Sequence, residues 1–78
     1  MNRIRDLRED NDLTQKDISK VVNVTQAQYS RYESGIYELS YDGLIKLAQF
    51  YNTSIDYILG ITNEKKPYPR KKEKQQNS

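Results

Sequence analysis

Residues 15–34 read QKDISKVVNVTQAQYSRYES, and this stretch predicts two short helices joined by a tight turn. Each helix has a start signal, because Thr14 and Thr25 stand directly before the two runs and a threonine hydroxyl can accept a hydrogen bond from the first helical turn. Three residues after each threonine comes Asp17 or Gln28. The second site therefore has the capping-box pattern, and the first has an acidic variant of it.

The turn between the two helices is predicted at Asn23. A sharp turn between crossing helices needs a residue at positive φ, and asparagine is one of the few residues besides glycine that tolerates it. Ser19 is small enough to let the two backbones approach closely where they cross. The inward side chains follow a helical period and are Ile18, Val21, Val22, Val24, Tyr29 and Tyr32.

The second helix has a small, polar face on the side opposite Tyr29 and Tyr32. At about 100° per residue, this face carries Ala27, Ser30, Arg31 and Ser34. Arg31 is its only charge, and a guanidinium group matches either the N7 and O6 acceptors of guanine or a phosphate. Such a face suits a helix that lies in a groove about 12 Å wide.

With the residues laid out in this way, the stretch resembles the helix-turn-helix of the phage Cro/repressor family of DNA-binding regulators. The resemblance runs from about residue 4 to residue 60. Its most specific parts are Leu13-Thr14-Gln15, Asn23-Val24-Thr25 and Tyr32-Glu33-Ser34-Gly35. It implies an all-α fold, a compact five-helix domain of the lambda-repressor type.

The chain departs from the family pattern in three places. Ser19 stands where family members usually carry alanine, and Asn23 stands where they usually carry glycine. The loop after Gly35 is often basic and contains proline in the family, but here it reads Ile36-Tyr37-Glu38-Leu39. Its usual phosphate contacts are therefore not carried over.

The resemblance implies a sequence-specific regulator of transcription that binds double-stranded DNA as a dimer on a palindrome. We expect a repressor of phage, prophage or mobile-element type that reads the major groove with the helix at residues 25–34. The expected base contacts are Thr25, Gln26, Ala27, Ser30 and Arg31. The expected DNA backbone contacts are Gln15, Lys16, Gln28, Ser34 and Tyr37. In the family, the glutamine matching Gln15 also supports the first residue of the recognition helix, and Gln28 has a second interpretation as a capping residue.

Two further sets of residues follow from the resemblance. Arg8 is expected to pair with Glu33 and to tie the first helix to the end of the recognition helix. Tyr57, Ile58 and Ile61 lie at the end of the domain where family members often dimerise, although core packing is the favoured interpretation for Ile58.

The remaining elements are predicted from caps and periodicity. A first helix is expected over residues 2–10. Ser40 begins a helix that runs to Tyr51 and ends at Asn52, and Ser54 begins a short helix over residues 55–59 that stops at Gly60. We expect a helix-turn-helix domain over residues 1–61 and a basic, flexible tail over residues 62–78.

Composition narrows the possible functions. The chain has 78 residues and contains neither cysteine nor histidine. Most nucleophile–base pairs and transition-metal sites need one of these residues, so we expect no enzyme, metal or cofactor. The N-terminus lacks an apolar signal segment and no stretch is long enough to span a bilayer, which predicts a cytoplasmic protein.

The charge is unevenly distributed. The net charge is +2, but residues 1–61 hold seven basic and nine acidic residues, whereas residues 62–78 hold six basic and two acidic ones. The folded part is therefore not a strongly basic surface. An alternative function remains open, a protein-interaction module of antitoxin or antirepressor type that binds a partner through Ile36, Tyr37 and Tyr41. A weaker alternative is an RNA binder that acts through the tail, which has few aromatic residues for stacking.

Overall fold

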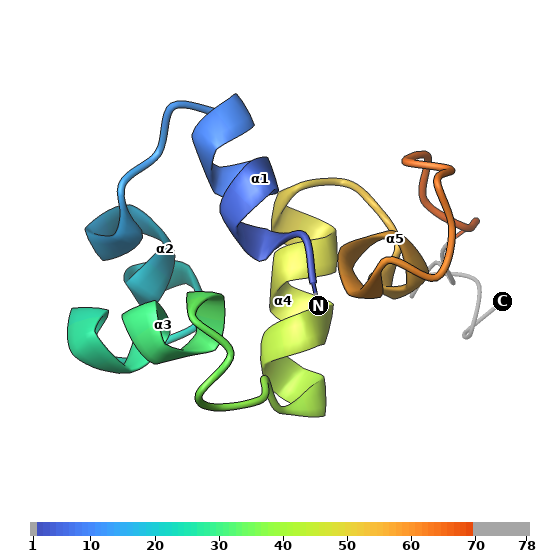
Figure 1. The fold of residues 1–78 in the computed structure, drawn as a ribbon. Helices are drawn as coiled ribbons and strands as arrows, with labels where there is room; N and C mark the ends of the chain where they lie inside the picture. The colour runs from blue at the N-terminus through green and yellow to red at the C-terminus, as the bar shows by residue number, and fades with distance from the viewer. Residues whose placement is uncertain (1, 70–78) are drawn as a thin grey trace, which may run out of the picture.

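The computed structural model describes residues 2–69, and over this range it contains five α-helices and no strand. The helices are α1 (Ile4–Asp10), α2 (Gln15–Val21), α3 (Gln26–Glu33), α4 (Tyr41–Phe50) and α5 (Ile55–Leu59) (Figure 1). The predicted all-α, five-helix fold is confirmed. Helix α1 begins two residues later than predicted, and its first amide, at Ile4, donates to the Asn2 side chain.

The predicted N-caps begin four of the five helices. The hydroxyl groups of Thr14, Thr25, Ser40 and Ser54 each accept a hydrogen bond from the backbone N–H three residues later, at distances of 3.0–3.1 Å. These caps satisfy amide groups that have no partner within the helix. Helix boundaries in this chain are therefore set largely by short polar side chains.

The two capping sites of the helix-turn-helix differ. At the start of α2 the capping box is complete, because Asp17 also accepts a hydrogen bond from the Thr14 backbone N–H at 2.9 Å. At the start of α3 only the threonine half forms, and the Gln28 side chain donates instead to the Tyr32 hydroxyl at 3.0 Å. The prediction of a capping box at Gln28 was wrong for this reason.

Among residues 2–69, three non-glycine residues have positive φ, all of them just after a helix. Asn23 has φ 61°, as predicted for the turn between α2 and α3. Asn52 has φ 54° just after α4, and Asp12 has φ 56° between α1 and α2. Asparagine and aspartate are the residues that tolerate this region best after glycine. Gly60 ends α5 in the same left-handed conformation.

The core is centred on α4, which lies between the α2–α3 pair on one side and α5 on the other (Figure 1). Every helix contributes at least one fully or almost fully buried apolar side chain. The buried apolar residues are Ile4, Leu7, Ile18, Val22, Tyr29, Leu44, Leu47, Ala48 and Ile58. Because Tyr29 is completely buried, the inner face of α3 is fixed against the core and its opposite face points to solvent.

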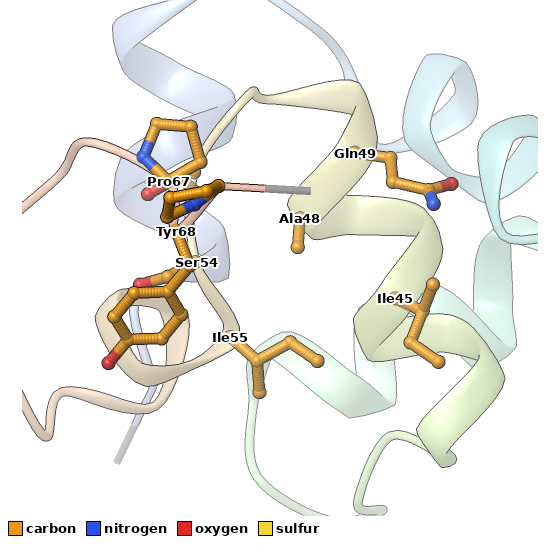
Figure 2. Close-up of a pocket in the computed structure, with 9 residues that line it drawn as sticks. Ile45, Ala48, Gln49, Ser54, Ile55, Pro67 and Tyr68 are labelled. Carbon is orange, nitrogen blue, oxygen red and sulfur yellow. The ribbon is translucent and has the colours of Figure 1, made fainter. Parts of the chain in front are cut away.

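The first part of the predicted tail lies against the helices. Thr53 donates to the Lys65 carbonyl oxygen at 2.6 Å, and the Tyr68 hydroxyl donates to Asp56 at 2.6 Å. Figure 2 shows Pro67 and Tyr68 beside Ser54, on one side of a pocket of about 340 Å³ whose other side is formed by α4. Residues 62–69 are thus attached to the domain, and the predicted flexible tail beyond them lies outside the described residues.

Candidate nucleic-acid interface

The solvent-facing side of α3 carries most of the residues predicted to touch bases. Thr25, Gln26, Ala27 and Arg31 are exposed, and Ser30 is half-buried. Arg31 lies in the last turn of α3, and no ion pair with it is present among residues 2–69. The face is therefore polar, sterically open and positively charged at one point.

The predicted backbone-contact residues are more varied. Lys16 and Ser34 are exposed at the ends of α2 and α3, and the Ser34 hydroxyl donates to the Arg31 carbonyl oxygen at 3.2 Å. Gln15 is half-buried, and its side-chain amide donates to Glu33 at 3.1 Å. The structure thus links Gln15 to the C-terminal end of α3. No hydrogen bond links its side chain to the first residue of that helix within the described range.

Arg8 and Glu33 form a bidentate ion pair between α1 and the end of α3. The Arg8 Nε and Nη2 atoms donate to the two carboxylate oxygens at 2.6 and 3.1 Å. The Arg8 side chain is 13% exposed and the Glu33 side chain 5%. The remaining Arg8 nitrogen, Nη1, donates to the Leu13 carbonyl oxygen at 2.9 Å. This one side chain therefore connects α1 both to the loop that follows it and to α3.

The charge state of this pair is stabilised by its neighbours. Burial alone would raise the pKa of Glu33, but hydrogen bonds from Arg8 and Gln15, together with the nearby Tyr29 hydroxyl, hold that pKa below its usual value. The hydrogen bond to Glu33 raises the pKa of Arg8. Glu33 therefore stays ionised in the folded protein and keeps the three N–H donors that Arg8 and Gln15 supply.

Two tyrosines border the same cluster, Tyr29 completely buried and Tyr51 half-buried. Burial first, and then the neighbouring Glu33 carboxylate, raise the pKa of Tyr29. Burial also raises the pKa of Tyr51 to about 12. Both phenols are consequently neutral at ordinary pH.

The loop between α3 and α4 is an exposed aromatic surface. Ile36 is 67% exposed, Tyr37 48% and Tyr41 87%. The backbone N–H groups of Ile36 and Tyr37 both donate to the Arg31 carbonyl oxygen, at 3.0 and 3.2 Å. Gly35, with φ 85°, allows the chain to turn back in this way.

Of the three residues predicted at a dimer interface, only one is well exposed. Ile61 is 70% exposed, whereas Tyr57 is half-buried beneath the Arg3 guanidinium, whose carbon lies 4.1 Å from the ring centre. Ile58 is completely buried in the core of the single chain. The assignment of Ile58 to an interface was therefore wrong, because its side chain has no surface to offer a second subunit.

Sequence reasoning missed Tyr32. Tyr32 packs against the core, as predicted, but it is only half-buried, and it also accepts the hydrogen bond from Gln28 and packs its ring against that of Tyr37. The spacing from Gln28 to Tyr32, one helical turn, is the signal that could have indicated the contact.

The buried face of α3, its open polar face and the tight turn at Asn23 define a helix-turn-helix protein. A family model described as helix-turn-helix matches residues 4–58. The chain belongs to this family, and the resemblance to regulators of the Cro/repressor type is confirmed.

Three curated proteins of Bacillus subtilis strain 168 are similar to the chain. The uncharacterized HTH-type transcriptional regulator YobD is 33% identical over 70 residues, which is 90% of this chain and 62% of YobD. The HTH-type transcriptional regulator ImmR is 34% identical over 58 residues, 74% of this chain and 46% of ImmR. The uncharacterized HTH-type transcriptional regulator YqaE is 33% identical over 63 residues, 80% of this chain and 54% of YqaE.

The chain thus spans roughly half to three-fifths of the length of these relatives. No solved structure gave a significant match. No helix among the described residues is both long enough and apolar enough to cross a bilayer.

Proposed function

We propose that this chain is a sequence-specific regulator of transcription that binds double-stranded DNA and reads the major groove with α3. The observation that carries the proposal is the division of α3 into two faces. Tyr29 is completely buried on one face, while Gln26, Ala27 and Arg31 are exposed on the other. An α-helix fits the major groove, where each base pair presents a distinct pattern of donors and acceptors. The names of the curated relatives support the same function.

Within this proposal the residues of the open face have separate roles. Gln26 can form two hydrogen bonds with adenine, Ala27 can pack on a thymine methyl group, and Arg31 can bind guanine. Thr25 and Ser30 complete the set of proposed base contacts. The proposed phosphate contacts are Gln15, Lys16, Gln28, Ser34 and Tyr37. Gln15 and Gln28 already donate within the protein, so each can bind phosphate only through its second amide hydrogen or by exchanging partners.

We further propose a repressor of phage or mobile-element type that acts as a dimer by covering a promoter. Two α3 helices about 34 Å apart would read half-sites about 10 base pairs apart, centre to centre. Tyr57 and Ile61 remain the proposed contacts between subunits. Such a regulator would act in the cytoplasm without catalysis, and the basic residues from Lys65 to Lys74 would add affinity that does not depend on sequence.

Selection from random duplex DNA tests this function directly. The wild-type protein should enrich a palindrome, and a gel shift on the enriched site should show one complex that resists competition by unrelated DNA. Sedimentation of that complex should give two chains per site. Enrichment of no sequence would contradict the function, whereas enrichment of a single half-site by one chain would contradict only the dimer.

A second candidate function is supported by the exposed aromatic surface at Ile36, Tyr37 and Tyr41. Tyr37 and Tyr41 line a groove of about 470 Å³ together with Leu39, Leu44 and Leu59. Exposed apolar surface of this kind is typical of protein contacts. If Ile36→Ala and Tyr41→Ala abolish activity in cells while DNA selection by the wild type finds no site, the chain is a protein-interaction module of antitoxin or antirepressor type.

A further inference from the structure

We propose that the aromatic pair Tyr32–Tyr37 positions two DNA-binding side chains before DNA is bound, Arg31 for its base contact and Gln28 for its phosphate contact. This inference rests on the proposed function and deepens it, because it assigns positioning roles to two residues that flank the open face of α3. It also gives the loop after α3, which contains no basic residue, a part in recognition.

Arg31 is held from the loop side. Its guanidinium carbon lies 5.9 Å from the centre of the Tyr37 ring, at the outer limit of a cation–π contact. The backbone that carries the ring is fixed to α3, because the backbone N–H groups of Ile36 and Tyr37 both donate to the Arg31 carbonyl oxygen. The backbone of Arg31 and its side chain are thus both in contact with the same short loop.

Tyr37 is itself anchored to the core through a row of three rings. The centre of its ring lies 6.4 Å from that of Tyr32, with 63° between the planes. Tyr32 in turn makes an edge contact with Tyr29, also at 6.4 Å and with 84° between the planes. Edge-to-face pairs at this separation are favourable. Since Tyr29 is completely buried, the row runs from the core to the solvent-exposed ring beneath Arg31.

Gln28 is held by the middle ring of the row. Its side-chain nitrogen donates to the Tyr32 hydroxyl at 3.0 Å, one turn further along α3. This bond replaces the second half of the capping box, which Asp17 completes at the start of α2. The side chains of Gln28 and Arg31 are therefore attached to opposite ends of one aromatic pair.

Fixing long side chains in their bound conformation before binding increases affinity, because less side-chain conformational entropy is lost when the protein binds DNA. The freedom of one such side chain corresponds to about a two- to tenfold change in affinity. The effect should appear on the preferred DNA sequence, where the side chain must adopt one geometry. It should be absent on unrelated DNA, where a mobile arginine can still reach a phosphate.

The first test needs no DNA. In the NMR spectrum of the free protein, the Arg31 side chain should show nuclear Overhauser contacts with Tyr37 ring protons, and its Nε–Hε signal should be shifted by the ring. Tyr37→Leu should return that signal to the range of free arginine, and Tyr37→Phe should retain the shift. Phe50→Leu is the matched control, since Phe50 is also 48% exposed and lies at the end of α4. Absence of the wild-type contacts would overturn the proposal.

The second test is a double-mutant cycle on the duplex selected by the wild type. The reference is Tyr37→Phe, which already lacks the hydroxyl proposed to reach a phosphate but keeps the ring beneath Arg31. Relative to it, Tyr37→Leu should weaken binding about two- to tenfold when Arg31 is present, but should have no further effect in Arg31→Ala. Equal losses in both backgrounds would mean that the ring acts independently of Arg31, and would overturn the positioning role. Tyr32→Phe keeps the ring and removes only the acceptor for Gln28, so it should weaken binding to the selected duplex while leaving affinity for unrelated DNA unchanged.

Failure of this inference can be told apart from failure of the proposed function. If the wild type selects no sequence, the DNA-reading function fails, whatever the NMR contacts show. If the wild type selects a site but the cycle shows independent losses, only the positioning role fails. Thermal unfolding of each variant shows whether a loss of binding comes from loss of the fold.

Discussion

Arg8 and Arg31 carry the same guanidinium group in opposite surroundings. Arg8 is 13% exposed and holds Glu33 and a backbone carbonyl with three nitrogen atoms. Arg31 is exposed, and its guanidinium carbon lies over the Tyr37 ring, 5.9 Å from the ring centre. The first arginine joins parts of the protein, and the second is presented to whatever lies outside it.

The position of Glu33 explains the difference. Glu33 follows Arg31 by two residues on α3, and side chains two apart on a helix do not face each other. The carboxylate therefore turns inward to Arg8 and Gln15 and leaves the neighbouring arginine open. One helix end thus supplies both a structural ion pair and an unpaired surface cation. The predictions that follow test this division.

The largest effect is expected from Glu33→Ala. The substitution leaves the mostly buried Arg8 guanidinium without its carboxylate and should reduce the free energy of unfolding by about 3 kcal/mol. Urea denaturation followed by circular dichroism measures the change. Lys46→Ala is the matched control, because the Lys46–Asp42 pair is exposed on α4 and should be worth only about 0–1 kcal/mol. Equal midpoints for the two variants would mean that Arg8 behaves as a surface residue.

Lowering the pH should also reduce the stability that the ionised Glu33 gives the wild-type protein. Because the pKa of Glu33 is lowered by folding, its contribution to stability is complete above the unfolded pKa of about 4.3 and is lost as pH falls through the folded pKa. Glu33→Gln lacks this titration. The difference in stability between wild type and variant should therefore shrink from pH 6 toward about pH 2. A difference that stays constant would show that ionisation of Glu33 does not stabilise the fold.

Arg31→Ala should affect DNA binding rather than stability, in contrast to Glu33→Ala. Stability should change little because the side chain is exposed. Binding to the selected DNA site should weaken by about 1–3 kcal/mol, with relaxed preference at one base pair in each half-site. Titrations on the cognate site and on unrelated DNA at several salt concentrations measure both effects. A uniform loss on all sequences, with a smaller salt dependence, would assign Arg31 to a phosphate instead.

The smallest changes in stability are expected from the N-caps of α2 and α3. Thr14→Ala and Thr25→Ala each remove one cap and should each cost about 1 kcal/mol of stability. Thr14→Ala should cost more, because losing the hydroxyl also weakens the reciprocal bond in which Asp17 accepts from the backbone N–H of residue 14, a bond that α3 lacks. Thermal unfolding of the pair gives the comparison. A greater loss for Thr25→Ala would show that the incomplete cap is the more important one.

The fold was predictable because its boundaries depend on local chemistry. Thr14, Thr25, Ser40 and Ser54 each act within three residues of themselves, and the positive φ of Asn23 depends on its own side chain. Such features can be predicted from neighbouring residues in the sequence. The Arg8–Glu33 contact joins residues 25 apart, and it was anticipated only because the resemblance supplied the pairing.

Other features could not be predicted from the sequence, because alternative contacts compete for the same side chains. The Gln28 side chain could bond either to the backbone of the N-cap residue Thr25 or to the Tyr32 hydroxyl. Side-chain geometry, which the sequence does not specify, decides between them. An isoleucine such as Ile58 suits either an interface or a core, and the sequence favoured the core without excluding the interface; the packed structure leaves it completely buried. The attachment of residues 62–69 rests on bonds such as that from Thr53 to Lys65, which no helical period indicates.

Arg3 joins the two ends of the domain, and this has a consequence for how the protein opens. Its backbone N–H donates to the Ile58 carbonyl oxygen at 2.8 Å, and its guanidinium group donates to the carbonyl oxygens of Tyr57 and Thr62 and to the Asn63 side chain. Neither end can fray without breaking bonds that also hold the other. Backbone amides at the start of α1 and the end of α5 should therefore exchange with solvent deuterium at matching rates, as a single cooperative unit.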